Sequence, residues 1–537
     1  MTVTATSNAS FGARSAARIL VDALAHHGVD TVFGIPGTHN IPIYGALADV
    51  GIRHVLMRHE QGCAYAADGY ARVSRRPGVV ITTTGPGLLN SAAALAQSMS
   101  DSVPVLVISP GMPTNHPALG TGELHEMRSQ SATLSSIVKS SYRVQTVEEI
   151  PATVAACFVD MLAGRPRPVH LELPFDLLHW GAEVRDVDPV QLPKLRVEEK
   201  AVSDATAILT QARRPLIIAG GGVGAEAAPQ LKALAEYLGA PVVTTFNGKG
   251  CFPENHQLSA GAGLGRPAIY KSMAEADVIL AVGTELAPSD LWYGRIPEKR
   301  LIRIDVDPHA VLRNARAEVT MVAEAGPALA ALRAELASTV HVEPLWAARV
   351  IEAAKDDAST KAQRWMHLIE GLTDAVDADS IIVGDSTMAC YYGVGSTVPL
   401  AKPHHYLYPT GFGTLGYGLP ASVGAALAAP DSRIVCIEGD GGLMFSVNEL
   451  TAAAHLGLAL PVIVVTNGGY GEIRRQMAET LDTVHAVDFA PPRLQALAEA
   501  FGCHYLKATD ATSIAKSMSA AWAADCPTII EIPEDHA

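Results

Sequence analysis

The chain alternates between short, uninterrupted apolar runs and longer segments with helical periodicity. Residues 79–83, 103–109 and 433–437 are rich in β-branched side chains, as expected for strands that are covered on both faces. Segments such as 13–27 and 446–456 repeat apolar residues at the spacing of a helix that buries one face. This alternation predicts parallel sheets with right-handed helical crossovers.

The pattern ends and restarts twice. A strand and a proline-marked exit close the first unit near residue 178, and a charged, proline-containing stretch follows at 186–200. A second unit opens with the strand and glycine turn of residues 215–222, and a third opens near residue 380. We therefore predict an α/β fold of three doubly wound parallel-sheet domains. Their expected bounds are residues 1–185, 195–340 and 360–537.

Composition narrows the class of protein. Of the 537 residues, 48% are hydrophobic and 18% charged, which suits a globular chain with large cores. The formal charge of −15 disfavours a nucleic-acid partner, because phosphate binding requires a basic face. A polar N-terminus without an apolar signal region, and no run long enough for a membrane span, predict a cytoplasmic protein without membrane contact. The seven cysteines are scattered and show neither a CxxC pair nor a Cys/His cluster with zinc spacing.

Two glycine-rich motifs follow neighbouring predicted strands in the third unit. Gly439-Asp440-Gly441-Gly442 follows one strand, and Thr466-Asn467-Gly468-Gly469 follows the next. Mg²⁺ prefers oxygen ligands shared with a phosphate group, and we predict that Asp440, Asn467 and the Gly469 carbonyl bind it. The backbone at Gly439, Gly441 and Gly442 could approach a diphosphate closely. Alone, either motif could be an ordinary tight turn or strand-end cap.

The paired motifs resemble the signature of the thiamine diphosphate enzymes, in which GDG is followed by an asparagine pair. Thr466 departs from the first member of that pair, but the metal-binding asparagine is present as Asn467. The stretch from Arg58-His59-Glu60 to Tyr70-Ala71-Arg72 resembles the acetolactate synthase-like family, in which the glutamate is the activating acid. The resemblance therefore gives Glu60 the role of holding the cofactor's pyrimidine nitrogen while the thiazolium carbon loses its proton to form an ylid.

Further stretches along nearly the whole chain match the same family. Leu415 corresponds to the bulky residue that bends the cofactor, for which plain core packing is the alternative. The resemblance implies that a larger set of residues contacts thiamine diphosphate besides Glu60 and the glycines of the GDGG motif: Pro36, Asn90, Asp385, Ser386, Thr414, Leu415, Tyr470, Gly471, Glu472 and Ile473.

The implied reaction is non-oxidative decarboxylation of a 2-oxo acid through an enamine, with carboligation of the acetolactate synthase type as the alternative. The stretch Leu124-His125-Glu126 departs from the acetolactate synthase pattern and is similar to that of the 5-guanidino-2-oxopentanoate decarboxylase subgroup. His39, His125 and Gln97 are candidates for proton transfer or substrate binding, with a structural role as the alternative. Glu126 and Glu472 are candidate partners for a cationic substrate tail, or else solvated charges.

Other functions and partners are implied more weakly. A non-catalytic thiamine diphosphate-binding subunit and a nicotinamide dehydrogenase are competing classes, and the retained acid and metal ligands disfavour the first. The glycine-rich turn at residues 220–224 leaves FAD open as a ligand of the central domain, although the family's flavin-side stretch is absent. The family also implies a homodimer or homotetramer with the cofactor at the subunit interface and a small-molecule 2-oxo acid as substrate.

Overall fold

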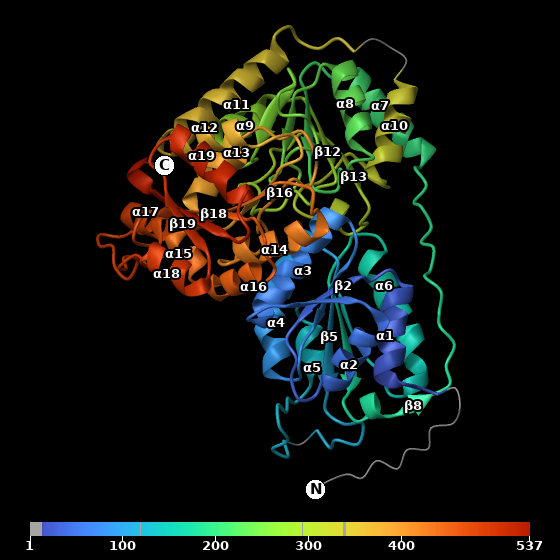
Figure 1. Cartoon of the computed structure of the whole chain (residues 1–537). Helices are drawn as coiled ribbons and strands as arrows, with labels where there is room; N and C mark the ends of the chain where they lie inside the picture. Colours follow the sequence, from blue (N-terminus) through green and yellow to red (C-terminus); the bar gives the residue numbers. More distant parts are fainter. Residues whose placement is uncertain (1–12, 119, 293, 337–339, 537) are drawn as a thin grey trace. The chain divides into compact units, whose positions relative to one another are not determined.

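The computed structural model describes residues 13–118, 120–292, 294–336 and 340–536. The chain divides into two compact units, Met1–Leu192 and Pro193–Ala537. Within the described residues there are three six-stranded parallel sheets and one two-stranded antiparallel pair, β1 (Arg14–Ser15) with β8 (Gly181–Ala182). Helices pack beside each large sheet, as Figure 1 shows. The predicted fold class, three α/β domains with doubly wound parallel sheets, is confirmed.

The first unit is built on a sheet with the strand order β3-β2-β4-β5-β7-β6. The chain runs outward from β2 in one direction and from β4 in the other, so the switch point lies between these two strands. The strands of this sheet are β2 (Thr31–Gly34), β3 (Arg53–Leu56), β4 (Gly78–Ile81), β5 (Val105–Gly111), β6 (Ser140–Arg143) and β7 (Val169–Pro174). The helices are α1 (Ala16–His26), α2 (Ile41–Val50), α3 (Glu60–Ser74), α4 (Pro86–Asp101), α5 (Gln130–Leu134) and α6 (Ile150–Leu162).

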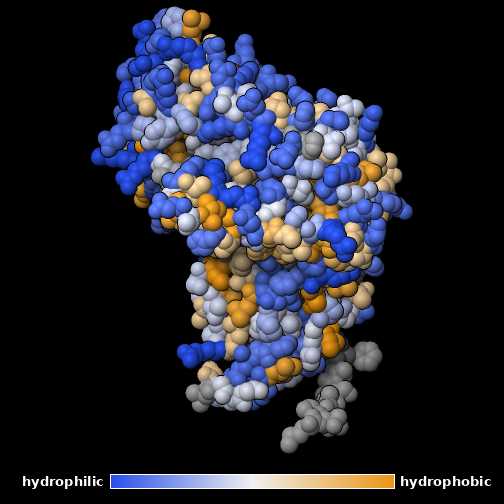
Figure 2. Space-filling view, turned by 90° about the vertical axis from the view of Figure 1, so that its left-hand side faces the viewer, coloured by the Kyte–Doolittle hydropathy of each residue, from blue (hydrophilic) through white to orange (hydrophobic). Residues whose placement is uncertain are grey.

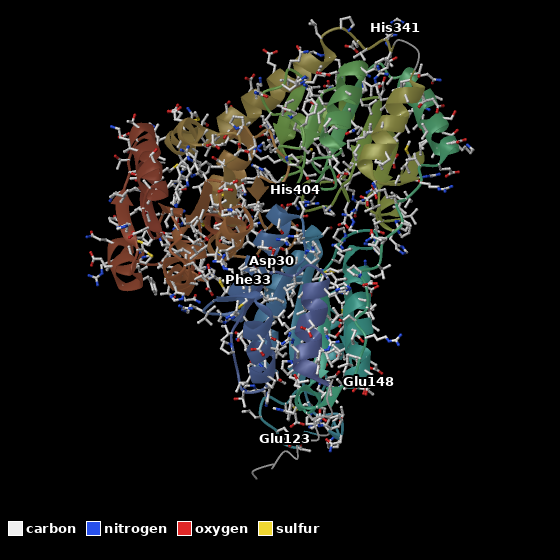
Figure 3. The ribbon with its side chains drawn as sticks, turned by 45° about the vertical axis from the view of Figure 1, so that its right-hand side comes forward. Asp30, Phe33, Glu123, Glu148, His341 and His404 are labelled. Carbon is white, nitrogen blue, oxygen red and sulfur yellow. The ribbon has the colours of Figure 1, made fainter. Side chains whose placement is uncertain are left out.

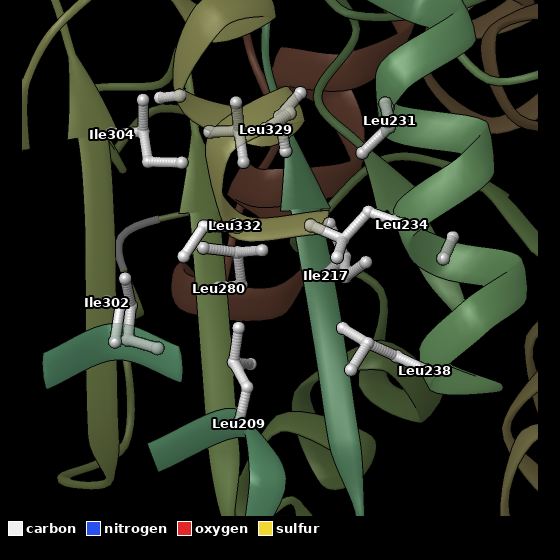
Figure 4. Packing of buried hydrophobic residues seen from close by; sticks show 14 of the residues in the cluster. Leu209, Ile217, Leu231, Leu234, Leu238, Leu280, Ile302, Ile304, Leu329 and Leu332 are labelled. Carbon is white, nitrogen blue, oxygen red and sulfur yellow. The ribbon is translucent and has the colours of Figure 1, made fainter. Parts of the chain in front are cut away.

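The second unit contains a central sheet with the order β11-β10-β9-β12-β13-β14. Leucines and isoleucines of its strands and helices interlock in one core, including Ile217, Leu280 and Leu329 (Figure 4). The strands are β9 (Pro215–Ala219), β10 (Val242–Thr244), β11 (Ser259–Ala262), β12 (Val278–Val282), β13 (Arg300–Asp305) and β14 (Val319–Val322). The helices are α7 (Glu199–Thr210), α8 (Ala228–Leu238), α9 (Pro267–Glu275) and α10 (Ala325–Glu335).

The same unit contains a C-terminal sheet with the order β16-β15-β17-β18-β20-β19. Renumbered from its own first strand, this order equals that of the first unit, and its switch point lies between β15 and β17. The strands are β15 (Ile381–Gly384), β16 (Tyr406–Leu407), β17 (Ile434–Gly439), β18 (Pro461–Thr466), β19 (His504–Lys507) and β20 (Thr528–Pro533). The helices are α11 (Trp346–Ala362), α12 (Met366–Ala375), α13 (Gly395–Thr397), α14 (Gly418–Ala428), α15 (Asp440–Leu443), α16 (Leu450–His455), α17 (Gly471–Thr480), α18 (Leu494–Phe501) and α19 (Ala511–Trp522), with a π-helical segment η5 (Ala389–Val394). Short 3-10 turns complete both units: η1 (Val147–Glu149), η2 (Leu177–His179), η3 (Ala310–Leu312), η4 (Gln363–Trp365), η6 (Val447–Glu449) and η7 (Glu534–His536).

The local sequence explains where the elements lie. All residues of β4, β5 and β7 are buried. Strand β4 and most of β5 are accordingly apolar, whereas β7 alternates and buries the polar side chains of His170 and Glu172. Helix α2 carries a proline in its first turn, where the missing N–H is not needed, and it ends at Gly51 with φ +80°. The order of these elements puts the carboxyl ends of all six strands at one edge of each sheet.

One local expectation needs correction. The GDGG motif was expected to be a loop before a helix at residues 446–456, but Gly439 ends β17 and a helical turn, α15, begins at Asp440 itself. The expected later helix is shorter, with η6 and then α16. The glycines permit the tight turn, and burial of Leu443 holds the segment against the sheet. Among the described residues, no helix combines the length and the apolar character needed to cross a bilayer.

Candidate functional site

The carboxyl edge of the first sheet brings Glu60 and Asn90 together. Glu60 opens α3, shortly after β3 ends, and Asn90 lies in the first turns of α4. The Asn90 side-chain amide donates a 2.9 Å hydrogen bond to Glu60 Oε2. A Cβ at Gly87 would lie 3.1 Å from Glu60 Oε1, so the glycine leaves room for that second oxygen. Glu60 and Asn90, which were predicted from separate motifs, are therefore in contact. Asn90 binds Oε2 of the Glu60 carboxylate and does not engage Oε1.

The two candidate histidines also meet at this edge. The His39 ring stacks on Phe175 with centroids 4.9 Å apart and lies edge-on to His125 at 5.3 Å. Each histidine has a buried Nδ1 without a hydrogen-bond partner among the described residues. Burial, and then the neighbouring His125, lower the pKa of His39, although Glu123 opposes this. His39 is therefore a neutral imidazole near pH 7, with one nitrogen available to a ligand.

A set of polar residues fixes the end of the loop that carries His125. Gly85, with φ +64°, donates its N–H to Gln130 Oε1 at 2.7 Å, and a Cβ there would lie 2.4 Å from the His125 carbonyl oxygen. Gln130 Nε2 donates to the Pro110 carbonyl at 2.8 Å. The Glu172 carboxylate accepts from Ser131 and from Arg143. The loop carrying His125 is thus tied to the strand ends of β4, β5 and β7.

Gln97 belongs to a different environment. It is buried on α4, and its amide donates to Asp101 Oδ2 at 2.6 Å. Asp101 also pairs with Arg72, which in turn pairs with Asp68. The Oε1 atom of Gln97 is buried without a partner among the described residues. This network holds α3 against α4, so Gln97 has a structural role in addition to any contact with substrate.

Pro36, another predicted cofactor contact, is exposed in the loop after β2.

The loop of residues 112–129 contains the candidate carboxylate Glu126. Its two oxygens accept hydrogen bonds from the backbone N–H groups of Thr121 and Gly122, at 3.0 and 2.7 Å. His116 Nε2 lies 3.0 Å from Oε1 of the same carboxylate. These contacts, led by the Thr121 N–H, lower the pKa of Glu126. Glu123, labelled in Figure 3, is the exposed carboxylate of this loop.

In the second unit, Asp440 and Asn467 lie at adjacent strand ends, as the motif spacing indicated. Asp440 Oδ2 accepts from the N–H groups of Asn467 and Gly468 at 3.1 and 2.8 Å, and Oδ1 accepts from Gly441. A Cβ at Gly471 would lie 2.8 Å from Asn467 Nδ2, so the start of α17 packs against this side chain. Burial raises the pKa of Asp440, against those backbone hydrogen bonds. A bound cation would favour its ionised form.

The predicted ligand Gly469 donates its N–H to Asn467 Oδ1 at 3.1 Å. It forms an isolated antiparallel bridge with Asp488 and lies between Arg474 and Val487. A side chain could not fit at this position. The backbone of the Asn-Gly-Gly segment therefore folds back onto the Asn467 side chain, whose amide oxygen is the second predicted metal ligand.

Asp385 anchors the other side of this switch point. It is buried, and its carboxylate accepts from the N–H groups of Ser386, Gly416 and Tyr417 at 2.7 to 3.3 Å. The fully buried Glu438 lies beside it and accepts from the Leu419 N–H at 2.8 Å. Burial raises the pKa of both carboxyl groups. The neighbouring Asp385 raises the pKa of Glu438 further, whereas hydrogen bonds from Glu438 and from the backbone oppose the rise at Asp385. The two carboxyl groups can share one proton. Asp385 accepts hydrogen bonds from more backbone N–H groups than Glu438 does, so we assign this proton to Glu438.

The surroundings suit a diphosphate and a divalent cation. The hydroxyls of Thr414 and Ser446 are buried without a hydrogen-bond partner among the described residues, so both are available to a polar ligand. A Cβ at Gly442 would lie 2.7 Å from Asp385 Oδ2, and one at Gly441 would lie 3.0 Å from the Tyr470 ring. The absence of side chains at these glycines lets the α15 turn pack closely against Asp385 and Tyr470 at the strand ends. The carboxylate and amide oxygens of Asp440 and Asn467 match the ligand preference of Mg²⁺.

Residues 470–473 stand at the start of α17. The first-turn N–H groups of a helix lack partners within the helix and favour an anion. Glu472 accepts hydrogen bonds from the Tyr392 hydroxyl, Arg475 and Gln476 at 2.6 to 3.2 Å. Burial raises the pKa of Glu472, but these three donors bring it below its ordinary value. Its carboxylate is therefore already engaged. Ile473 is exposed, while Leu415 and Ser386 are half-buried.

Three polar or aromatic residues at these edges carry no motif that we recognised in the sequence. Phe175 stacks on His39, Glu438 lies against Asp385, and the Thr83 hydroxyl is buried without a described partner. Each lies within two residues of the carboxyl end of a buried strand. That position is the signal that could have selected them, because ligands of open α/β sheets bind there.

Comparison with known proteins identifies the family. Models described as thiamine pyrophosphate enzyme match three successive parts of the chain. They are the N-terminal TPP binding domain at residues 14–133, the central domain at 202–332 and the C-terminal TPP binding domain at 383–532. The chain belongs to the thiamine pyrophosphate enzyme family. Thiamine pyrophosphate is thiamine diphosphate, so the predicted cofactor class agrees with this family.

Individual thiamine pyrophosphate enzymes are similar over nearly their whole length. The chain is 38% identical to a probable 2-ketoarginine decarboxylase of Pseudomonas aeruginosa, covering 96% of this chain and 94% of the relative. It is 31% identical to a probable acetolactate synthase large subunit of Methanocaldococcus jannaschii, covering 97% and 92%. It is 30% identical to acetolactate synthase isozyme 2 large subunit of Escherichia coli, covering 97% and 95%. The predicted resemblance to decarboxylases and acetolactate synthases is confirmed.

Proposed function

We propose that this thiamine pyrophosphate enzyme catalyses the non-oxidative decarboxylation of a 2-oxo acid, with Mg²⁺ as its metal. The observation that carries the proposal is the Asn90–Glu60 contact at the carboxyl edge of a TPP-binding domain. It supports the proposal because a carboxylic acid at this edge could hold the pyrimidine nitrogen of the cofactor. The 38% identity to a protein named 2-ketoarginine decarboxylase supports decarboxylation over other reactions of the family.

The cofactor, when bound, supplies the electron sink needed to break the carbon–carbon bond beside a carbonyl. Glu60 would hold a proton on the pyrimidine nitrogen through Oε1, since Asn90 occupies Oε2. Asp440, Asn467 and the Gly469 carbonyl would hold the cation. Backbone N–H groups at Gly441, Gly442 and the start of α17 would bind the diphosphate.

The remaining predicted residues have proposed roles in shape and proton transfer. Leu415 would support the bent cofactor, with Thr414, Asp385 and Ser386 around it. His39 and His125 face one another within 5.3 Å and would bind the substrate carboxylate or deliver the final proton. A neutral His39 can accept a hydrogen bond or donate one, depending on its tautomer.

Acetolactate synthase-type carboligation is the second candidate function. The relatives named acetolactate synthase, at 30–31% identity, favour it. The two reactions share every step up to loss of carbon dioxide and differ in whether a proton or a second 2-oxo acid reacts next. A non-catalytic subunit is disfavoured because Glu60, Asp440 and Asn467 are all retained.

Within this function, 2-ketoarginine and related cationic 2-oxo acids are the leading substrate class. The two carboxylates first considered for the cationic tail, Glu126 and Glu472, each already accept several hydrogen bonds. Glu123 is exposed and acts electrostatically on His39. We therefore favour Glu123 over Glu126 and Glu472 as a tail contact.

We further propose a cytoplasmic homodimer or homotetramer, with domains at residues 1–185, 195–340 and 360–537 and with the cofactor between subunits. The visible face in Figure 2 is largely hydrophilic but includes several hydrophobic patches. Large apolar side chains are solvent-exposed in both units, among them Ile41 at 61%, Leu124 at 57% and Phe412 at 55%. In the proposed assembly, a second copy of the chain would cover side chains of this kind. FAD binding by the central domain is not part of the proposal.

The test is a panel of 2-oxo acids (pyruvate, branched, aromatic and guanidino) with thiamine diphosphate and Mg²⁺, analysed for carbon dioxide, aldehyde and acetohydroxy acid. We expect aldehyde in equal amount to carbon dioxide, with the guanidino substrate turned over fastest. Acetohydroxy acid as the main product would replace decarboxylation by carboligation. No carbon dioxide from any acid, although the cofactor binds, would contradict both.

A further inference from the structure

A cluster of metal-ligating side chains lies at the amino-terminal edge of the C-terminal sheet. Strands β19 and β20 run parallel, and His504 is paired with Thr528. The His504 N–H donates to the Pro527 carbonyl at 2.9 Å. Asp525 and Cys526 directly precede this point, so the pairing brings all three side chains to one place. The sequence showed no zinc spacing because His504 begins β19, whereas Cys526 lies further along the chain in the segment between α19 and β20.

The donor atoms are close enough to share an ion. One ligand atom from each of His504, Asp525 and Cys526 lies within 4.8 Å of the others. His504 Nε2 and Asp525 Oδ1 are 3.5 Å apart. In a tetrahedral zinc site, bonds of about 2.0 to 2.3 Å place neighbouring ligand atoms about 3.5 Å apart. The His504 and Asp525 side chains are 57% and 94% exposed, so they can close around an ion without disturbing a core.

We propose that His504, Asp525 and Cys526 form a binding site for a divalent cation of the zinc class, with water as the fourth ligand. Nitrogen and thiolate donors suit Zn²⁺ or Co²⁺ and do not suit Mg²⁺, which prefers oxygen ligands. The site is separate from the oxygen-lined pair Asp440 and Asn467. Those residues lie at the carboxyl edge of the sheet, and six-residue β20 spans about 20 Å between the two edges.

The neighbouring thiol of Cys503 provides a matched control. Burial, and then the nearby Cys526, raise the pKa of Cys503 to about 12. Its Sγ contacts the Phe501 carbonyl at 3.7 Å and does not belong to the group of mutually close ligand atoms. A serine at Cys503 should therefore leave the cation site intact, whereas a serine at Cys526 removes its thiolate.

The consequence is structural rather than catalytic. A cation bound there would link the segment between α19 and β20 to the start of β19, and it would stabilise this edge by binding only the folded chain. The inference is independent of the proposed reaction. Decarboxylase turnover with Mg²⁺ should be unchanged in Cys526→Ser.

The test uses Co²⁺ added to the full-length holoenzyme, saturated with thiamine diphosphate and Mg²⁺, after the thiols are reduced with a phosphine. We expect a near-ultraviolet thiolate-to-cobalt absorption band that saturates at one Co²⁺ per chain. Exchange of Co²⁺ at the oxygen-lined site gives no such band, because no thiolate is there. Zn²⁺ should displace the Co²⁺ and remove the band.

Four variants make the result decisive. Cys526→Ser should abolish the band, and His504→Ala should weaken Co²⁺ affinity at least tenfold. Cys503→Ser and His341→Ala, an exposed histidine labelled in Figure 3, should behave as the unmodified protein does. Absence of the band in the unmodified protein would overturn the proposal, as would its persistence in Cys526→Ser or its loss in Cys503→Ser.

Discussion

Some of the buried polar atoms that have no hydrogen-bond partner among the described residues lie where the strands of two sheets end. At the first sheet they are the Nδ1 atoms of His39 and His125, and at the C-terminal sheet they are the hydroxyls of Thr414 and Ser446. Leaving such an atom unsatisfied costs about 1–3 kcal/mol. A fold tolerates this cost where a ligand or water completes the hydrogen bonds. These atoms therefore support the proposal that cofactor and substrate bind at these strand ends.

Glu60 gives the sharpest prediction for a single residue. Glu60→Gln should lower turnover by about 100-fold or more, because an amide cannot exchange the proton that the carboxyl group holds. Asn90 can still hydrogen-bond the glutamine oxygen, so folding should be unchanged. Steady-state decarboxylation and the circular dichroism spectrum would be measured together. Turnover within a few-fold of the unmodified protein would remove Glu60 from the mechanism.

His170 predicts a pH dependence of stability. Its ring is fully buried between the hydroxyls of Ser109 and Ser141, and burial lowers its pKa to about 3. Between pH 7 and pH 5 the unfolded chain, with an ordinary histidine pKa of about 6.5, gains a proton that the folded chain does not, which costs about 2 kcal/mol of stability. Stability from this group is thus present above the unfolded pKa and is lost as pH falls.

The variant His170→Gln removes that contribution. The drop in urea midpoint from pH 7 to pH 5 should be smaller in His170→Gln than in the unmodified protein, whatever the overall stability of the variant. Equal drops would show that His170 does not remain neutral in the folded state. The exposed His341 provides the control, since His341→Gln should leave the drop unchanged.

Residues within a short motif were predictable, and residues that depend on long-range pairing were not. Asp440 and Asn467 follow strands joined by one crossover, so their approach could be inferred from local sequence. Phe175 reaches His39 from a strand far along the chain. Nothing local in either segment indicates that contact, because it depends on the strand order β2-β4-β5-β7.

At the scale of the elements, close backbone packing fixes the turns after the strands. Gly220 follows β9, and its N–H donates to the Val282 carbonyl of neighbouring β12 at 2.9 Å. A Cβ at Gly220 would lie 2.3 Å from the Gly283 carbonyl oxygen. This glycine-rich turn, which from sequence could have been a dinucleotide loop, therefore also has a packing reason for its glycine.

Gly220→Ala should destabilise the protein by about 1–3 kcal/mol, because the backbone of β12 must shift to accommodate the methyl group. Gly224→Ala is the matched control, since the nearest atom to its Cβ would be His404 Nε2 at 3.8 Å. Thermal unfolding of both variants would test the contrast. Equal melting temperatures would show that the turn after β9 is more adaptable than its backbone contact implies.

Element types were more predictable than local boundaries. Continuous apolar runs identified β4, β5 and β17 because strands buried on both faces need apolar side chains throughout. The helical turn α15 was missed because its glycines have low helix propensity, and tertiary packing at the strand end overrides that preference. The π-helical segment η5 was not predicted either, because no local sequence pattern distinguishes a π-helix from an α-helix.

At the scale of the whole molecule, two sheets share one strand order and divide the chemistry between them. The first sheet and the C-terminal sheet both place their switch point between the first and third strands of the sheet. The proposed acid, Glu60, follows a strand of one sheet, and the proposed cation ligands follow strands of the other.

This division predicts complementation between two inactive variants. We propose that each cofactor is held by Glu60 of one subunit and by Asp440 of another, so Glu60→Gln and Asp440→Ala should each be inactive alone. If the two are unfolded together and refolded as a mixture, half of the dimers are mixed, and each mixed dimer contains one site with both residues intact. The mixture should regain about one quarter of the unmodified activity, as symmetric pairing of two patches requires. Refolding each variant alone is the control for recovery. If both residues served the same cofactor from within one chain, every site would lack one of them, and no activity would return.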